Sequence, residues 1–194
     1  MPPIFPPEYD IEKKYVNMYH NTLSGHLQEM IQQGLEGNEF VTLLTWVKSY
    51  NSTELMKHPE LNIDTDDLGP LLENNVIEDL QNQYLRTMKF NIMEWMKNSL
   101  VQDKKDWFRV EHPDADGDGY YSTSLPVMIF QMMEQNLQVA RLIGEEMVKK
   151  VLELFADELN LFAKDYVAEI ESYKDRHLQD RSEIKFFLHY MIAN

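Results

Sequence analysis

A short acidic segment, Asp-Ala-Asp-Gly-Asp-Gly-Tyr at residues 114–120, is the stretch whose residue types and spacing come nearest to those of a metal site. Asp114, Asp116 and Asp118 stand at positions one, three and five of a helix–loop–helix calcium loop, and Gly119 stands where that loop has its turn glycine. Position twelve of such a loop supplies a bidentate glutamate, but here it is Leu125. We therefore interpret the segment as an acidic turn between two helices and expect no bound metal. A calcium-binding helical module that uses this loop is the alternative.

The other residue types that perform chemistry in enzymes are scattered or absent. The sequence has no cysteine, which excludes disulfides, thiolate zinc sites and a cysteine nucleophile. No nucleophile-elbow, Walker-type or dinucleotide-binding motif is present. The histidines form no His-x-x-x-His pair, and we expect each to be a surface or packing residue: His20, His26, His58, His112, His177 and His189. The sequence therefore predicts a protein without catalytic residues or cofactors.

One polar cluster interrupts an otherwise apolar helical pattern. Its members are Gln131, Glu134, Gln135, Asn136 and Gln138. Asn136 lies close to the inward row, where an amide must find hydrogen-bond partners because burying it alone is unfavourable. A buried network that fixes the helix register and a binding site are equally compatible with this pattern.

The charge balance restricts the partners. The 33 acidic residues outnumber the 18 basic ones and give a formal net charge of −15, which argues against a nucleic-acid-binding face and against unaided docking on an anionic membrane. The longest uncharged stretch, residues 119–133, is too short and too polar to span a bilayer. With 43% hydrophobic and 26% charged residues, the composition is that of a soluble folded protein.

The elements that would carry these residues are helices, because apolar residues recur at steps of three and four throughout and strand alternation is absent. The dominant stretch, Tyr120 to Lys174, reads as one helix of roughly fifty residues, about 75 Å long. Its first apolar row is Ile129, Met133, Leu137, Ala140, Gly144, Met147, Val151 and Leu154. Its second row is Val148, Leu152, Phe155, Leu159, Phe162, Tyr166, Ile170 and Tyr173. We expect an all-α, elongated bundle of long antiparallel helices.

Further helices are expected at 8–33, 39–50, 70–101 and 184–194, with an irregular segment at 102–119. The first should bury the row Ile11, Tyr15, Tyr19, Leu23, Leu27 and Met30 or Ile31. The second should direct inward Phe40, Leu43, Leu44 and Val47. The inward row of the third is Val76, Leu80, Tyr84, Met88, Ile92, Trp95 or Met96, and Leu100. The whole chain, 1–194, is expected to be one helical-bundle segment, divisible into sub-bundles 1–58 and 70–194.

The apolar C-terminal segment ends without a glycine cap or a polar tail. Either it is a buried terminal helix, or the chain continues beyond Asn194 in a longer protein, which we favour. In the second case Phe186, Phe187 and Met191 should be partly exposed in this chain and should promote its association.

Several blocks of the sequence together resemble a known family. The blocks are Leu43-Leu-Thr-Trp-Val47, Asp103-Lys-Lys-Asp-Trp107, Asp118-Gly-Tyr-Tyr121, Leu125-Pro126, Phe130-Gln-Met132, Glu134-Gln-Asn-Leu-Gln-Val-Ala140, His177-Leu178 and Tyr190-Met-Ile-Ala193. In this order they are similar to exocyst complex component 3, the Sec-six type subunit of the exocyst. The resemblance covers most of the chain from about residue 38 onward.

The resemblance implies a middle fragment of a longer, non-enzymatic protein, folded as part of a rod of stacked helical bundles. It implies a role in tethering secretory vesicles to the plasma membrane during exocytosis. The expected partners are other exocyst subunits and, through the complex, SNARE proteins and small GTPases. The expected location is the cytoplasm, with recruitment to sites of exocytosis. A paralogous helical-rod protein that acts in membrane protrusion is the alternative within the same fold.

Overall fold

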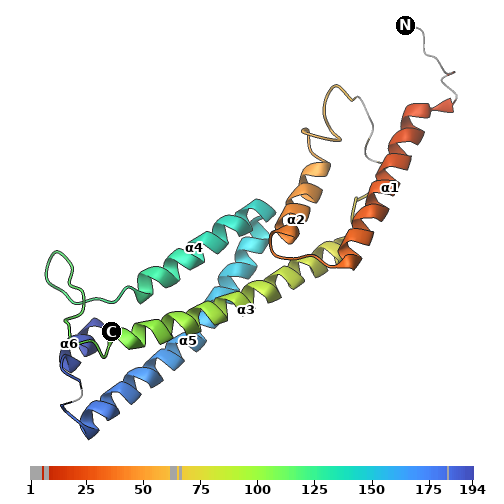
Figure 1. Ribbon diagram of the computed structural model, residues 1–194. Coiled ribbons are helices and arrows are strands. Elements are labelled where there is room, and N and C mark those ends of the chain that lie inside the picture. The colour runs from red at the N-terminus through yellow and green to blue at the C-terminus, as the bar shows by residue number, and fades with distance from the viewer. Residues whose placement is uncertain (1–5, 7–8, 62–64, 66, 183) are drawn as a thin grey trace. The chain divides into compact units, whose positions relative to one another are not determined.

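The computed structural model describes residues 6, 9–61, 65, 67–182 and 184–194, which form six α-helices and no β-strand (Figure 1). The helices are α1 (Ile11–Gln33), α2 (Asn38–Tyr50), α3 (Asn74–Asp106), α4 (Leu125–Ile143), α5 (Glu145–Gln179) and α6 (Phe187–Ala193). The all-α prediction is confirmed, and the predicted bounds of the first three helices are correct to within five residues. The chain divides into two compact units, residues 1–84 and 85–194, and the division falls inside α3.

The first unit has its core on α2, on the residues that lead into α3 and on the first turns of α3. Phe40, Leu43 and Leu44 of α2 are buried as predicted, and Leu72 and Leu80 are each only 1% exposed. The interior also holds a polar pair, because His20 Nδ1 lies 3.1 Å from the Tyr50 hydroxyl oxygen in a buried hydrogen bond.

The inward row predicted for α1 is wrong over its first half. Tyr15 and Tyr19 are 69% and 55% exposed, whereas Leu27 is 6% exposed. The reason is geometric: each step of four residues advances by about 40° around an α-helix. Five such steps, from Ile11 to Ile31, rotate by about 200°, so the row starts on one face and ends near the opposite one. The buried side of α1 instead includes His20 and Leu27.

In the second unit, α4 is antiparallel to α3, and α5 is antiparallel to α4, so that α3 and α5 are parallel (Figure 1). The contacts agree, since the residue numbers rise together along both helices. Lys89 Nζ lies 2.9 Å from Glu158 Oε1, and Lys104 forms an ion pair with Glu169 further along. The consecutive pairs α3–α4 and α4–α5 are antiparallel, as predicted (Figure 1).

The single long helix predicted from Tyr120 to Lys174 is wrong. It is divided at Gly144, whose φ of 150° and ψ of 171° lie in a region that is essentially restricted to glycine. The Gly144 N–H donates to the Ala140 carbonyl over 3.0 Å, and the Gly144 carbonyl accepts from the Val148 N–H over 3.2 Å. One residue therefore ends α4 and begins α5, and the chain reverses there, so that the two helices pack side by side (Figure 1).

The reversal places both halves of the first predicted row in the core. Ala140 and Val151 are completely buried, and Leu137 and Met147 are 5% and 1% exposed. The second row is less uniform, because Phe155 and Tyr173 are 3% exposed but Leu152, predicted to be buried, is 43% exposed. α5 also extends to Gln179, beyond the predicted end at Lys174.

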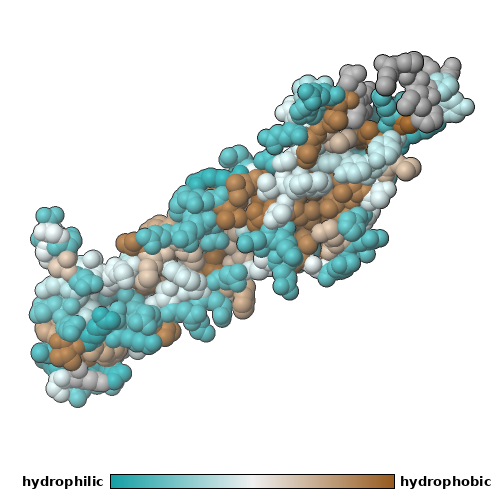
Figure 2. Space-filling view, turned by 45° about the horizontal axis from the view of Figure 1, so that its top comes forward, coloured by the Kyte–Doolittle hydropathy of each residue, from teal (hydrophilic) through white to brown (hydrophobic). Residues whose placement is uncertain are grey.

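Apolar side chains reach the surface among hydrophilic ones (Figure 2). The most exposed of the large ones include Tyr15, Met18, Tyr120, Leu188 and Ile192. Within the described part of the chain, no helix combines the length and the apolar character that are needed to cross a membrane.

Candidate functional site

The acidic segment forms a tight turn organised by a single carboxylate. Asp116 Oδ1 accepts hydrogen bonds from the backbone N–H groups of Asp118, over 3.0 Å, and of Tyr120, over 2.8 Å. The Asp116 N–H in turn donates to the Tyr120 carbonyl over 2.9 Å, and Gly119 takes a φ of 85°. Across the residues that the structure describes, no three or more histidine or acidic side chains gather closely enough to hold a metal ion. Calcium binding by Asp114, Asp116 and Asp118 therefore rests on the sequence pattern alone.

Three of the six histidines, dispersed in sequence, make ring contacts within or with residues 186–189. The rings of His112 and His189 lie 4.7 Å apart and nearly perpendicular, and His112 lies 4.0 Å from the Phe186 ring. His177 stacks on Phe187 with 3.9 Å between ring centroids and 3° between planes. These three histidines pack, as the sequence predicts.

The polar cluster of α4 forms no buried network. The half-buried Asn136 satisfies its amide within its own helix by donating to the Met132 carbonyl over 2.9 Å. Glu134 is exposed and accepts from Arg141 over 2.8 Å, which lowers the pKa of Glu134. The polar cluster, together with Arg141, therefore presents carboxylate, amide and guanidinium groups on the outer surface of α4.

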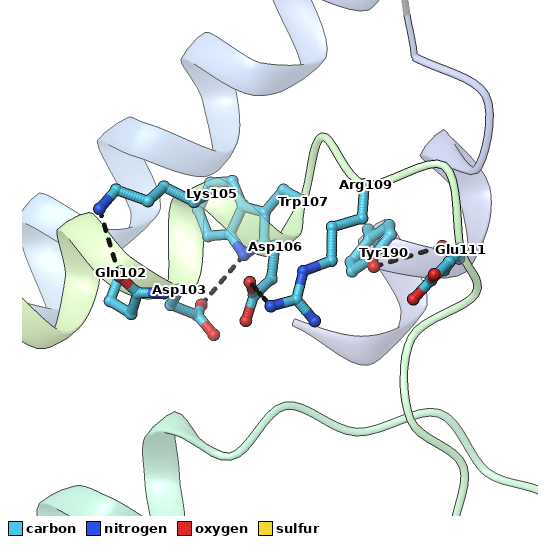
Figure 3. Close-up of polar contacts among 8 residues, drawn as sticks. All are labelled: Gln102, Asp103, Lys105, Asp106, Trp107, Arg109, Glu111 and Tyr190. Atoms are coloured by element: carbon cyan, nitrogen blue, oxygen red, sulfur yellow. Dashed lines mark hydrogen bonds and ion pairs between the residues drawn. The ribbon is translucent and has the colours of Figure 1, made fainter.

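The polar and aromatic groups that do converge lie where α3 ends. Trp107 is 1% exposed, and its indole Nε1–H donates over 3.0 Å to Asp103 Oδ2, whose residue is 5% exposed (Figure 3). Asp103 lies in the last turn of α3 and Trp107 directly follows that helix, so their spacing of four residues lets the two side chains meet at the end of α3. An ion pair of 2.6 Å between Asp106 and Arg109 lies beside it (Figure 3).

Trp107 belongs to a buried group that joins three helices, which we call the Trp107 cluster: Leu100, Trp107, Tyr173, Ile184 and Tyr190. Tyr173 of α5 places its ring 5.4 Å from the indole and donates its hydroxyl to the Trp107 carbonyl over 2.8 Å. Tyr190 of α6 donates to the Glu111 carbonyl over 3.3 Å (Figure 3). The backbone that leaves α3 is thereby bonded to both later helices.

The C-terminal aromatic residues pack on the same cluster. Phe186, Phe187 and Met191 are half-buried against it. Their partial exposure agrees with the sequence-based expectation, whereas the association expected of this end stays a prediction.

Burial dominates the electrostatics of the cluster. It raises the pKa of Asp103, and the nearby Asp106 charge adds to this effect, while the bond from Trp107 partly offsets it. Burial raises the pKa of Tyr173 to about 12, with a further contribution from Tyr190, and it also raises the pKa values of Tyr166 and Tyr190. The phenols are therefore neutral hydrogen-bond donors at physiological pH.

The arrangement fixes helices in place. Its hydrogen bonds run to backbone carbonyls and to one buried carboxylate, and its aromatic rings fill the space between α3, α5 and α6. Reasoning from residue types did not identify Asp103 and Trp107, although both lie in one of the blocks that carry the family resemblance. Their spacing of four residues was the available signal.

Residues 1–194 match the family model described as Exocyst complex component Sec6. Over 193 residues the chain is 41% identical to Exocyst complex component 3 of Drosophila melanogaster, with 98% of this chain and 26% of that protein covered. Over 191 residues it is 34% identical to an Exocyst complex component 3-like protein of Danio rerio, with 97% of this chain and 24% of that protein covered. The chain thus spans about a quarter of the length of these curated relatives.

The crystal structure of M-Sec is similar to this chain, with a TM-score of 0.70 and 22% sequence identity. The similarity covers 92% of this chain and 30% of that one. At this identity it shows a shared helical fold.

Proposed function

Because the chain belongs to the Sec6 family of exocyst complex components, we propose that it is a non-catalytic, helical segment of an exocyst subunit. In this proposal it helps to tether secretory vesicles to the plasma membrane through contacts with other subunits. The family match over all 194 residues is the observation that carries the proposal.

The buried chemistry supports a structural role. The most buried polar groups pair with other groups of the chain: Asp103 with Trp107, His20 with Tyr50, and Glu158 with Lys89. Side chains that make such internal contacts hold helices together and are not available to bind a substrate. Partner proteins would then bind to the outer surfaces of the helices, as expected for a subunit of an assembly.

The proposed partners are other exocyst subunits. Contacts with SNARE proteins and small GTPases are expected through the assembled complex, and the proposed location is the cytoplasm, with recruitment to the plasma membrane. The formal charge of −15 is consistent with recruitment through proteins, since an anionic bilayer repels an acidic surface.

A chimera tests the proposal. The matching quarter of the Drosophila protein would be replaced by this chain, and the chimera would be expressed in fly cells that lack their own copy. We expect it to co-purify with the other exocyst subunits and to restore secretion. The same chimera carrying Trp107→Ala, which removes the centre of the Trp107 cluster, should do neither. A stable chimera that assembles with no exocyst subunit would contradict the proposal.

A further inference from the structure

The junction between α4 and α5 consists of one residue in a restricted conformation. Gly144 is at once the residue that caps the end of α4 and the residue that caps the start of α5. Its φ and ψ, 150° and 171°, strongly disfavour any residue with a Cβ. The reversal of the chain therefore depends on the absence of a single side chain.

The sequence on either side of Gly144 is equally suited to a straight helix. Leu137, Ala140, Gly144, Met147 and Val151 are separated by three, four, three and four residues, which is the spacing of one uninterrupted helical face. Apart from Gly144, no glycine or proline lies between residues 127 and 179 to interrupt such a helix. The same residues thus encode both a hairpin and a straight helix.

Opening the hairpin within one molecule would expose the core of the second unit. Ile129, Leu137 and Ala140 of α4 and Met147 and Val151 of α5 are all at most 6% exposed, and bringing apolar area of this size into water is strongly unfavourable. A second copy in the same open form removes this obstacle, because each copy offers the other the surfaces that it has lost.

We propose that Gly144 is the hinge of a domain exchange between two copies of this chain. In the exchanged dimer α4 and α5 form one continuous helix, and residues 145–194 of each copy pack on residues 85–143 of the other. The contacts that join these two parts are kept, but they now join two molecules: Lys89 with Glu158, Lys104 with Glu169, and Trp107 with Tyr173.

The exchange is compatible with the connection before α4. Residues 107–124 stay with α3 and α4 of their own copy, so that this segment is not stretched. The two straightened helices would lie antiparallel, with the Gly144 residues near the middle, and a two-fold axis between them would close the assembly at two copies.

Gly144→Ala is the direct test, because alanine is favoured over glycine inside a straight helix and disfavoured in the hairpin. The matched control is Gly25→Ala in the interior of α1, where an added Cβ meets nothing within 4 Å and φ is ordinary. Each variant would be refolded at high protein concentration and its mass measured by light scattering after gel filtration. We expect Gly144→Ala to show a dimer fraction at least tenfold larger than that of the wild type, and Gly25→Ala to behave like the wild type.

Zero-length cross-linking identifies the exchange itself. Lys104 and Glu169 form an ion pair, so a carbodiimide should join them. In an exchanged dimer refolded from equal amounts of ¹⁵N-labelled and unlabelled chains, half of the cross-linked peptides should combine the two labels. A Gly144→Ala protein that stays monomeric, or a dimer whose cross-links all lie within one chain, would overturn the proposal.

A second variant covers the case in which Gly144→Ala does not fold. Three glycines inserted after Gly144 relax the hinge, and longer hinges disfavour exchange. We expect this variant to lose the dimer that the wild-type chain forms on refolding at high concentration. An unchanged dimer fraction would contradict a hinge at Gly144.

Discussion

The helices of the second unit are connected in different ways at its two ends. At one end, Gly144 alone connects α4 to α5, and backbone conformation decides the geometry. At the other end, residues 107–124 connect α3 to α4, and side chains from α3, α5 and α6 hold the first part of that connection in place. A short junction can thus be set by one permitted φ/ψ region, whereas a long one needs a set of tertiary contacts.

The largest expected effect at the long connection comes from Trp107→Ala. Removing a buried indole should lower the free energy of unfolding by about 3–5 kcal/mol. Hydrogen exchange resolved by peptide should show the loss in the end of α3, the end of α5 and α6, because these segments meet in the Trp107 cluster. Tyr120→Ala, in the same connection but 72% exposed, is the control and should change stability by less than about 0.5 kcal/mol. Equal losses in the two variants would contradict the role given to Trp107.

A smaller effect is expected from Tyr173→Phe, which keeps the ring and removes the hydroxyl. The Trp107 carbonyl would lose its 2.8 Å hydrogen bond, and an unsatisfied buried acceptor costs about 1–3 kcal/mol. Tyr190→Phe removes a longer bond, of 3.3 Å, to the carbonyl of the exposed Glu111, so its effect should be the smaller of the two. Urea denaturation followed by circular dichroism would rank them, and the reverse order would show that Tyr190 is the stronger connection.

The pH dependence of stability tests the buried carboxylate at the same end. Burial raises the pKa of Asp103 above its ordinary value of 3.8. A carboxyl with a raised pKa in the folded state contributes stability that is complete below pH 3.8 and is lost as the pH rises through the folded-state pKa. Asp103→Asn keeps an oxygen that can accept from Trp107 but has no proton to lose. We therefore expect this variant to be more stable than the wild type at pH 7, with the difference vanishing towards pH 4.

Asp106→Asn is the matched control for that comparison, because it removes the same charge three residues away on the same helix. Its partner Arg109 is exposed, so a small change of about 0–1 kcal/mol is expected. If both variants shift stability with pH in the same way, the effect belongs to the net charge of the chain and not to the burial of Asp103.

The smallest expected effect concerns the acidic turn within the long connection. Millimolar calcium should change neither the melting temperature nor the helical content, because position twelve of the loop is Leu125. Ligand that binds the native state must raise its stability. A rise of several degrees in the melting temperature, absent from an Asp114→Asn, Asp118→Asn double variant, would instead establish a calcium site.

The amino-acid pattern was sufficient to predict the class of the fold and most of the helices. Apolar spacing located α1, α2 and α3, and it identified inward residues such as Phe40, Leu44, Ile92 and Val151, which are buried. These features follow from local periodicity, because a helix needs one apolar face whatever neighbour covers it. The family could also be predicted from the sequence, because several blocks of residues resemble it in the same order.

The position of the chain reversal and the choice of packed helix faces could not be predicted from this pattern. A glycine within an apolar row fits both a continuous helix and a reversal, so Gly144 gave no local signal for the hairpin. The exposure of Tyr15 and Tyr19 depends on which neighbours cover α1. Residues spaced four apart also move gradually around that helix, so they do not share one face over its whole length. Trp107 and Tyr173 form a hydrogen bond although they lie 66 residues apart in the sequence, and no helical periodicity relates them. Periodicity is a property of one helix, whereas a junction between helices depends on contacts between residues that are distant in sequence.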